Sequence, residues 1–512
     1  MAPATQPQGS DRVGARLGAV SGVAPLRLGF RRSNNLGLLQ FACQQSIREF
    51  TSRLKVQTEC PDTVHGRKCG IMHNHFATRL FAMSSALLSD LRARGLIFQI
   101  AGEDTLAEWL DAEPRTLYCG FDPTADSLHI GSLVPLLMLR RFQLAGHRPL
   151  ALVGGATGLI GDPSFKAAER NLNTPDVVAN WVSKLQNQVS QFIDFSGKNS
   201  AKVVNNLDWT AGMDVLTFLR DVGKYFSINN MIQKESVKQR IEREGSGISF
   251  TEFTYMILQY YDFSELYRQH QCGLQIGGSD QWGNITGGID LTRRLHGGQA
   301  FGLTMPLVEK ADGTKFGKTE SGTIWLDAHK TSPYSFYQFW LNTSDTDVYK
   351  FLRYFTFLSV EDIAAIEAAD ATREGRPQGQ QILADEVTKL VHGEEGLAAA
   401  QRITQALFVG EAYTLGPDDL EQLALDGLPT TALSAESLAP TLTQLLCDVG
   451  MVTSGKQVKD ALKNKAVFIN GVPVDGAPPI DTAVCFQSDN ALHGRYWIVR
   501  LGKKKYHLFT AA

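Results

Sequence analysis

The segment Thr116-Leu117-Tyr118-Cys119-Gly120-Phe121 predicts a short buried strand, which begins a regular alternation of strands and helices. The spacing of apolar residues predicts a helix over 133–144, and residues 150–155 predict a second buried strand that ends in two glycines. Segments 202–206, 215–220 and 274–278 continue the pattern as strand, helix and strand. Such an order predicts an α/β fold with a parallel sheet, whose ligands bind at the carboxyl ends of the strands.

Composition excludes several classes of protein. The chain has 512 residues, 43% of them hydrophobic, and a formal net charge of −3, which is typical of a protein of several globular domains. No apolar run approaches the roughly 20 residues that a membrane-spanning helix needs. The 7 cysteines form no Cys-x-x-Cys pair. We therefore expect no membrane span, no disulfide scaffold, no metal site and a reducing compartment.

Residues 1–82 differ from the rest of the chain, with 11 Lys or Arg against 4 acidic residues and no sustained apolar period. The Arg-rich, acid-poor balance is typical of a mitochondrial transit peptide. The alternative is that Met83 is the working start, since an amphipathic helix over 87–96 follows it directly. We favour the second interpretation, and expect residues 1–82 to be disordered or absent from the mature protein.

The remaining chain divides by composition into four parts. We expect an α/β domain over 83–329 and a helical domain over 330–410, in which Ser332-Pro333 begins an aromatic-rich helix and residues 380–391 and 394–408 form two more. The acidic stretch 411–440 predicts a linker. Residues 441–512 predict a small basic module, with a helix over 456–465 and a hairpin over 467–474.

Three clusters carry chemistry. Residues 122–132 lie between the first strand and its helix, where backbone N–H groups bind phosphate and His129 can donate to a phosphoryl oxygen. A histidine that only caps the helix is the plainer interpretation. Residues 312–319 place Lys315 and Lys318 among glycines, as in a loop that closes over a polyphosphate. A solvated turn is the plainer interpretation here.

The third cluster is Tyr255, Gln259 and Asp262, which the spacing i, i+4, i+7 puts on one face of a helix. A buried carboxylate and amide destabilise a core unless both are hydrogen-bonded, so this face indicates a pocket for a polar ligand. Residues 277–284 add Asp280 and Gln281 at a strand end, where a ribose can be held.

Together these clusters resemble the bacterial-type tyrosyl-tRNA synthetases, a family of class I aminoacyl-tRNA synthetases. His129-Ile130-Gly131-Ser132 is similar to the family's His-Ile-Gly-His signature, and Lys315-Phe316-Gly317-Lys318-Thr319 to its Lys-Met-Ser-Lys-Ser signature. The resemblance runs from about Met83 to the C-terminus and includes residues 154–164. It implies a Rossmann-like parallel-sheet catalytic domain, a helical anticodon-binding domain and a small α+β RNA-binding domain like that of a ribosomal protein.

The resemblance also implies roles for individual residues. Tyr118 and Asp262 would bind the phenol hydroxyl of tyrosine, and the remaining tyrosine-binding residues would be Asp122, Asp162, Tyr255, Gln259 and Gln281. ATP would contact Gly120, His129, Gly131, Ser132, Asp280 and Lys318. The transition state would be stabilised by Thr124, His129, Lys166, Arg170, Lys315, Lys318 and Thr319. The tRNA would contact Lys456, Lys459, Lys463, Lys503, Lys504 and Lys505.

The implied activity is ligation of tyrosine to tRNA(Tyr), through tyrosyl-adenylate and with release of pyrophosphate. ATP with Mg²⁺ would be a substrate, with no tightly bound cofactor, and the family implies a homodimer. The compartment would be the cytoplasm, or the mitochondrial matrix if residues 1–82 are a transit segment. Ser132 departs from the family by replacing the second signature histidine, which removes one imidazole donor.

Two other functions stay open on the sequence alone. An RNA-binding protein that helps splicing, with synthetase activity impaired at Ser132, would bind RNA without activating an amino acid. Another nucleotidyltransferase of the same fold would make the adenylate of a different acid. The set Tyr118, Tyr255, Gln259 and Asp262 disfavours the latter.

Overall fold

The structure is a computed structural model that describes residues 86–161, 173–234, 237–238, 241, 248–313, 316–319, 322–434 and 439–511, all within the compact unit Met72–Ala512. The expectations for residues 1–82, and those for Asp162, Lys166, Arg170 and Lys315, lie outside the described residues. A helix over residues 86–93 begins the described part.

The predicted parallel sheet is confirmed. Its order is β1-β6-β5-β2-β3-β4, and every neighbouring pair is parallel except β1 with β6. The strands are β1 (Gln99–Ala101), β2 (Thr116–Phe121), β3 (Arg148–Val153), β4 (Lys202–Asn205), β5 (Cys272–Gly278) and β6 (Phe301–Met305). From β2 the chain moves to β3 and β4 on one side, and later to β5 and β6 on the other. The order therefore reverses between β2 and β5, where open α/β sheets bind ligands.

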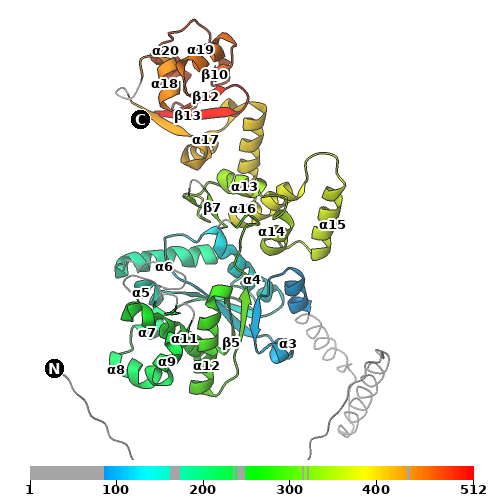
Figure 1. The fold of residues 1–512 in the computed structure, drawn as a ribbon, viewed down its shortest axis with the longest axis vertical. Coiled ribbons are helices and arrows are strands. Elements are labelled where there is room, and N and C mark those ends of the chain that lie inside the picture. Colours follow the sequence, from blue (N-terminus) through cyan, green and yellow to red (C-terminus); the bar gives the residue numbers. More distant parts are fainter. Residues whose placement is uncertain are drawn as a thin grey trace, which may run out of the picture. The chain divides into compact units, whose positions relative to one another are not determined.

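Helices cover both faces of this sheet. In Figure 1, α4 and α6 lie on one face, and α11 and α12 lie on the other. The helices of this part are α3 (Glu103–Ala112), α4 (Leu133–Leu144), α5 (Thr157–Ile160), α6 (Pro175–Val189), α7 (Leu207–Thr210), α8 (Val215–Thr217), α9 (Ile228–Ile232), α11 (Phe250–His270) and α12 (Trp282–His296). The helix expected over 215–220 begins as α8 and continues as a π-helical turn (Phe218–Val222).

The chain then forms helices α13 (Pro333–Leu341), α14 (Val348–Phe355), α15 (Val360–Ala371) and α16 (Gly379–Val409). Ser332 caps α13, as its sequence predicts, by accepting a hydrogen bond from the Ser335 N–H. The two helices expected over 380–391 and 394–408 are present as the two parts of α16, which meet at a kink at Gly393. Gly393 has φ 73° and ψ −177°, a conformation that essentially only glycine adopts.

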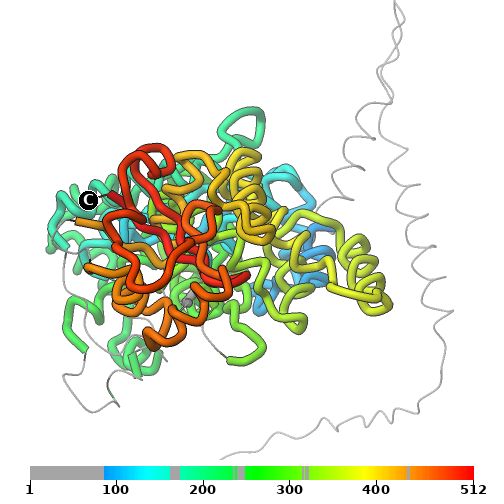
Figure 2. Tube along the Cα trace, turned by 90° about the horizontal axis from the view of Figure 1, so that it is seen from above, coloured from blue at the N-terminus to red at the C-terminus, as the bar shows by residue number. Residues whose placement is uncertain are grey.

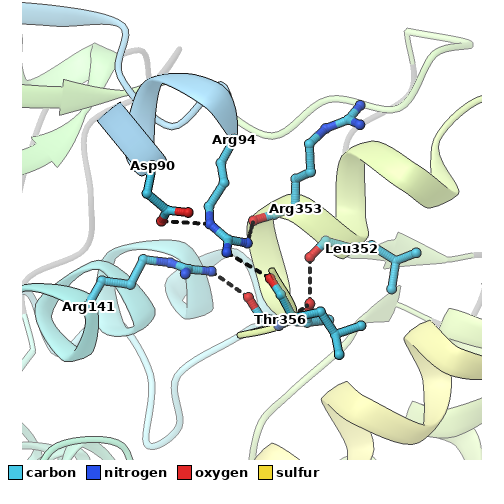
Figure 3. Close-up of polar contacts among 7 residues, drawn as sticks. Asp90, Arg94, Arg141, Leu352, Arg353 and Thr356 are labelled. Atoms are coloured by element: carbon cyan, nitrogen blue, oxygen red, sulfur yellow. Dashed lines mark hydrogen bonds and ion pairs between the residues drawn. The ribbon is translucent and has the colours of Figure 1, made fainter. Parts of the chain in front are cut away.

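Two buried arginines join this helical part to the α/β part. Arg94 follows the first helix and donates to the carbonyl oxygens of Leu358 at 2.7 Å and Arg353 at 3.3 Å. Arg141 of α4 donates to the carbonyl oxygen of Thr356 at 2.5 Å. Figure 3 shows both guanidinium groups converging on the end of α14. These cations satisfy carbonyl groups that a helix C-terminus leaves without intrahelical partners.

The C-terminal sheet has the order β11-β10-β12-β13-β9. Its first strand in the sequence, β9, lies parallel to its last strand, β13 (Figures 1 and 2). Its strands are β9 (Thr430–Leu433), β10 (Val467–Ile469), β11 (Val472–Pro473), β12 (Tyr496–Leu501) and β13 (Lys505–Ala511). The predicted hairpin over 467–474 is present, and Asn470 and Gly471 have φ 48° and 79° at its turn. Its helices are α18 (Leu442–Asp448), α19 (Gly455–Lys463) and α20 (Thr482–Cys485).

The linker expected over 411–440 is instead folded where the structure describes it. It contains a 3₁₀ turn (Ala412–Thr414), α17 (Pro417–Gln422), a π-helical turn (Leu423–Gly427) and strand β9. Strand β12 alternates between two cores, since Trp497 and Val499 pack toward α18 and α19, whereas Ile498 packs with Leu420 and Leu423. The acidic stretch therefore covers the second face of the C-terminal sheet. Its acidic side chains also form ion pairs, since the Arg402 guanidinium donates to the Asp419 carboxylate at 2.6 and 2.8 Å.

No helix in the described ranges is long and apolar enough to cross a membrane.

Candidate active site

A cavity of about 420 Å³ opens at the carboxyl ends of β2 and β5, where the strand order reverses. Residues of the first and third clusters line it together with Tyr118 and Gly120 of β2, although the two clusters are more than 100 residues apart in the sequence. They are Tyr118, Gly120, Asp122, Thr124, His129, Gly131, Ser132, Tyr255, Gln259, Asp262, Asp280 and Gln281.

Asp262 and Tyr118 form the buried end of the cavity, with 2% and 1% of their surfaces exposed. The Asp262 carboxylate accepts hydrogen bonds from Asn206 Nδ2 at 3.0 Å and Trp209 Nε1 at 2.9 Å. Burial raises the pKa of Asp262 to about 7, although the hydrogen bonds from Asn206 and Trp209 lower it. Burial, with the nearby Asp262, also raises the pKa of the Tyr118 hydroxyl, and that hydroxyl has no hydrogen-bond partner among the described residues. The buried end is thus a neutral hydroxyl beside a fixed carboxyl group.

A second carboxylate, Asp122, lies at the end of β2 and is held from two sides. The Tyr255 hydroxyl donates to one oxygen at 2.6 Å, and the Thr157 hydroxyl donates to the other at 2.6 Å. A Cβ atom on Gly154 would lie 2.0 Å from the Asp122 carboxylate, so the glycine at the end of β3 is required by this close approach. The network continues from Thr157 to Asn206 at 3.0 Å, which links Asp122 with Asp262.

Two amide side chains meet beyond Tyr255. Gln259 Nε2 donates to Gln281 Oε1 at 3.1 Å, and Gln281 Nε2 donates to Asp280 at 3.1 Å. The buried Gln259 Oε1 has no hydrogen-bond partner among the described residues. Buried polar atoms without partners are rare in folded proteins, so this oxygen indicates a site for a ligand donor.

His129 stands at the mouth of the cavity and is exposed. Its Nδ1 accepts a hydrogen bond from the Gly131 N–H at 3.0 Å, as the cap of the short turn Ile130–Ser132. In the neutral imidazole, the proton is therefore on Nε2, which makes that nitrogen a hydrogen-bond donor. His129 therefore caps this turn, as the plainer interpretation predicts, and a contact with a phosphoryl oxygen would use the other ring nitrogen.

The cationic loop of the second cluster reaches the same mouth through the backbone. Lys318 and Thr319 form β7, which pairs with β8 (Gly322–Thr323). The Gly317 carbonyl accepts from the Ile324 N–H at 3.0 Å, and the Ile324 carbonyl accepts from the Ile130 N–H at 2.9 Å. The two signature segments are therefore joined by one short ladder of backbone hydrogen bonds.

The sequence reasoning missed four polar residues of the site: Thr157, Asn206, Trp209 and Gln275. Asn206, Thr157 and Trp209 hold the carboxylates, and Gln275 of β5 lines the cavity with a buried Oε1 that has no hydrogen-bond partner among the described residues. One signal was available, because Asn206 directly follows a predicted strand and the carboxyl ends of parallel strands share one edge.

The six lysines expected to bind tRNA are exposed on the C-terminal part, in α19 and at the tip of the β12–β13 hairpin. Lys505 Nζ donates to the carbonyl oxygen of Gly450, between α18 and α19, at 3.5 Å. The hairpin tip therefore lies close to the turn that leads into α19, and the two groups of lysines belong to the same region.

Comparisons with known proteins agree with this geometry. The family model of class I tRNA synthetases (W and Y) matches residues 110–409, and that of the tyrosine–tRNA ligase SYY-like C-terminal domain matches residues 419–509. The tyrosine–tRNA ligase of Aliivibrio fischeri strain MJ11 is 63% identical over 427 residues, which are 83% of this chain and 99% of the relative. That of Chromobacterium violaceum is 60% identical over 424 residues, which are 83% and 98% of the two chains.

Among solved structures, a C-terminally truncated mitochondrial tyrosyl-tRNA synthetase of Aspergillus nidulans is similar, with a TM-score of 0.58 and 28% identity over 65% of this chain and 100% of that one. The chain belongs to the class I tRNA synthetases of the tryptophan and tyrosine group, and within that group to the tyrosine–tRNA ligase family.

Proposed function

We infer that the protein is an ATP-dependent tyrosine–tRNA ligase. It activates tyrosine to tyrosyl-adenylate, releases pyrophosphate, and transfers tyrosine to the 3′ end of its tRNA. The observation that carries this function is the buried pair Tyr118 and Asp262 at the end of a cavity whose mouth holds the His129 segment. Relatives named tyrosine–tRNA ligase, at 60–63% identity over most of the chain, support the same activity and disfavour the splicing-helper alternative.

We propose that Tyr118 and Asp262 hydrogen-bond the phenol hydroxyl of the substrate. Asp262 already accepts two hydrogen bonds, and a carboxylate has about four lone-pair sites, so acceptor capacity remains for the phenol. A ligand without the hydroxyl would leave both buried groups without that partner. Tyrosine ligases are themselves the standard example of this effect, with discrimination against phenylalanine of about 10⁵.

The ammonium group of tyrosine would lie among Asp122, Tyr255 and Gln259, with Asp162 completing the set. The free Oε1 of Gln259 and the carboxylate of Asp122 are acceptors, as three ammonium N–H donors require. Gln281 would lie on the carboxylate side of the substrate, next to the ribose-binding Asp280.

ATP would bind across the mouth of the cavity. A Cβ atom on Gly120 would meet no atom within 4 Å, so the strand end is open to an adenosine, and Gly131 and Ser132 line the same opening. His129 Nε2 would donate to a phosphoryl oxygen, beside the hydroxyl of Thr124. The cations and the hydroxyl assigned to the polyphosphate are Lys166, Arg170, Lys315, Lys318 and Thr319, and Mg²⁺ would enter as the counter-ion of ATP.

The chemistry then follows in two displacements. The tyrosine carboxylate attacks the α-phosphorus of ATP, the bond to the bridging oxygen breaks, and pyrophosphate leaves. A terminal ribose hydroxyl of the tRNA next attacks the activated carbonyl, and AMP leaves. No protein atom forms a covalent bond, so positioning and electrostatic stabilisation supply the rate enhancement.

The tRNA would contact the basic region of the C-terminal part, with phosphates bound by the lysines of α19 and the β12–β13 hairpin tip. Residues 330–410 would contribute to recognition of the anticodon. Lysine contacts of this kind neutralise phosphate charge and make binding strongly dependent on salt.

We further propose that the protein is a homodimer. Exposed apolar side chains gather on α8, the π-helical turn, α9 and the start of α11, around a small core of Val222, Met231 and Met256. They are Val215, Leu216, Leu219, Ile228 and Phe250, each more than half exposed. A patch of this kind indicates an interface, and a second copy is the occupant that the family implies. We place the protein in the cytoplasm, or in the mitochondrial matrix if residues 1–82 act as a transit segment.

The first test is tyrosine-dependent exchange of pyrophosphate into ATP, compared with phenylalanine and tryptophan. Exchange with tyrosine alone, lost in Lys318→Ala and weakened or less selective in Asp262→Ala, is the expected result. Absence of exchange with all three amino acids would overturn the ligase function and leave an RNA-binding protein.

A further inference from the structure

Helix α14 contacts the cationic loop at two places, one before Lys315 in the sequence and one between Lys315 and Lys318, although no residue of α14 lines the cavity. At the first place, the carboxylate of Asp347, at the N-terminus of α14, accepts from the Ala311 N–H at 3.0 and 3.1 Å. Lys350 of the same helix donates to the Glu309 carbonyl at 2.8 Å and pairs with Asp347 at 2.8 Å. The segment that enters the loop is therefore held by the first turn of α14.

At the second place, Phe316 is surrounded by four aromatic rings. Its ring centre lies 5.1 Å from that of Phe351 and 5.2 Å from that of Phe355, which belong to α14. The rings of Phe339 and Trp340, on α13, lie at 5.7 and 5.8 Å. We call these four residues the aromatic box.

The backbone next to Phe316 is tightly packed on the side of the active site. Gly317 has φ 76°, and a Cβ atom there would lie 2.4 Å from Cγ2 of Ile130. Phe316 and Gly317 thus lie between the aromatic box and the His129 segment, with little room to shift toward either. Lys318 is two residues after Phe316.

The far end of α14 is fixed to the α/β part by the two arginines of Figure 3. Arg94 is oriented by Asp90 at 2.8 Å and holds Arg353 and Leu358, and Arg141 holds Thr356. A helix fixed in this way can hold the loop in a defined position relative to the cavity.

We propose that α14 sets the position of the cationic loop for the adenylation step, and that Phe316 and Asp347 are positioning residues for this reaction. They act through the two lysines of the loop, since Lys315 directly precedes Phe316 and Lys318 follows it by two residues. The inference rests on the ligase function proposed above, and exchange by the unmodified protein tests that function separately.

The experiment measures tyrosine-dependent pyrophosphate exchange for Phe316→Ala, Phe316→Met and Asp347→Asn. A catalytic group displaced by about 1 Å costs roughly 100-fold in rate, so we expect kcat/KM for ATP to fall about 100-fold in Phe316→Ala. The Kd for tyrosine, measured without ATP, should change less than twofold, because the box does not line the cavity. Phe316→Met, which refills the box, should recover activity to within about fivefold.

A matched pair controls for simple loss of stability. Phe351→Leu and Phe336→Leu each remove a buried ring from the same helical part, but only Phe351 contacts Phe316. We expect lower kcat/KM for ATP only in Phe351→Leu, and no further loss when it is combined with Phe316→Ala. Three results would overturn the proposal. The first is an equal fall in kcat/KM for ATP in Phe351→Leu and Phe336→Leu, and the second is a Kd for tyrosine in Phe316→Ala that rises as much as kcat/KM for ATP falls. The third is exchange by Phe316→Ala within threefold of the unmodified protein. If Phe316→Ala does not fold, Phe316→Leu and Phe316→Met provide the same comparison.

Discussion

Replacing Asp262 by Asn tests the buried end of the cavity with almost no change in shape. In the unmodified protein, one carboxylate oxygen accepts from Asn206 and the other from Trp209. An asparagine must turn its NH₂ group toward one of these donors, which leaves a buried N–H group without an acceptor at a cost of about 1–3 kcal/mol. It also replaces a charged acceptor for the phenol, and such hydrogen bonds contribute about 1.5–3 kcal/mol.

We expect the Kd for tyrosine to rise roughly 10- to 150-fold, which is the lost hydrogen-bond energy of about 1.5–3 kcal/mol converted to a ratio of dissociation constants. Equilibrium dialysis with labelled tyrosine measures it directly. Selectivity for tyrosine over phenylalanine in the exchange assay should fall by a similar factor. Asp208→Asn is the matched control, since Asp208 is exposed two residues after Asn206, and it should leave both values unchanged.

The pH dependence adds a second readout. Burial raises the pKa of Asp262 to about 7, so between about pH 4 and pH 7 the folded protein holds a proton there that the unfolded chain releases. The contribution of Asp262 to stability is therefore complete at low pH and is lost as the pH rises through about 7, by at most about 4 kcal/mol. Asp262→Asn removes this dependence, so the Tm of the variant relative to the unmodified protein should improve from pH 5.5 to pH 8.5. Tyrosine binding within threefold of normal, together with an unchanged pH profile, would show that Asp262 neither binds the phenol nor has a raised pKa.

Four further outcomes are expected. Ser132→His should raise kcat for exchange about tenfold, because it adds one hydrogen bond to a charged group. The Ser132 side chain makes no capping hydrogen bond to α4, so the substitution removes none, and an unchanged kcat would contradict this expectation. Arg141→Ala should lower the free energy of unfolding in urea by about 2–3 kcal/mol, because it leaves the Thr356 carbonyl without this donor and opens a void; full stability would show that the bond contributes little. Alanine at residues 503–505 should weaken tRNA binding and reduce the slope of log Kd against log salt by about 2–3, with exchange unaffected, and a slope that does not change would exclude phosphate contacts there. Leu216→Asp should convert a dimer into monomers in sedimentation velocity runs, whereas a dimer that persists would place the interface elsewhere.

Interactions within a few residues of one another were visible in the sequence. Strand β2 and helix α4 begin and end where the pattern predicts, because a short apolar run and a helical spacing of apolar residues are local features of the sequence. The turn at Asn470 and Gly471 is likewise a local preference for positive φ. The clusters around His129 and Tyr255 were found from residue types and spacing, and the roles of their residues came from the resemblance to a family. The structure gathers Tyr118, Asp122, His129, Tyr255, Gln259 and Asp262 into one cavity.

The order and type of most secondary structure, and the residue types needed for the chemistry, could be predicted from the sequence. Which groups become partners could not, because sheet order and helix packing bring together segments that have no local relation. Asn206 and Trp209 orient Asp262 across more than 50 residues, and Phe316 enters a box built by α13 and α14. The acidic stretch 411–440 shows the same limit, since its composition is that of a linker and only packing against both α16 and the C-terminal sheet makes it part of a core.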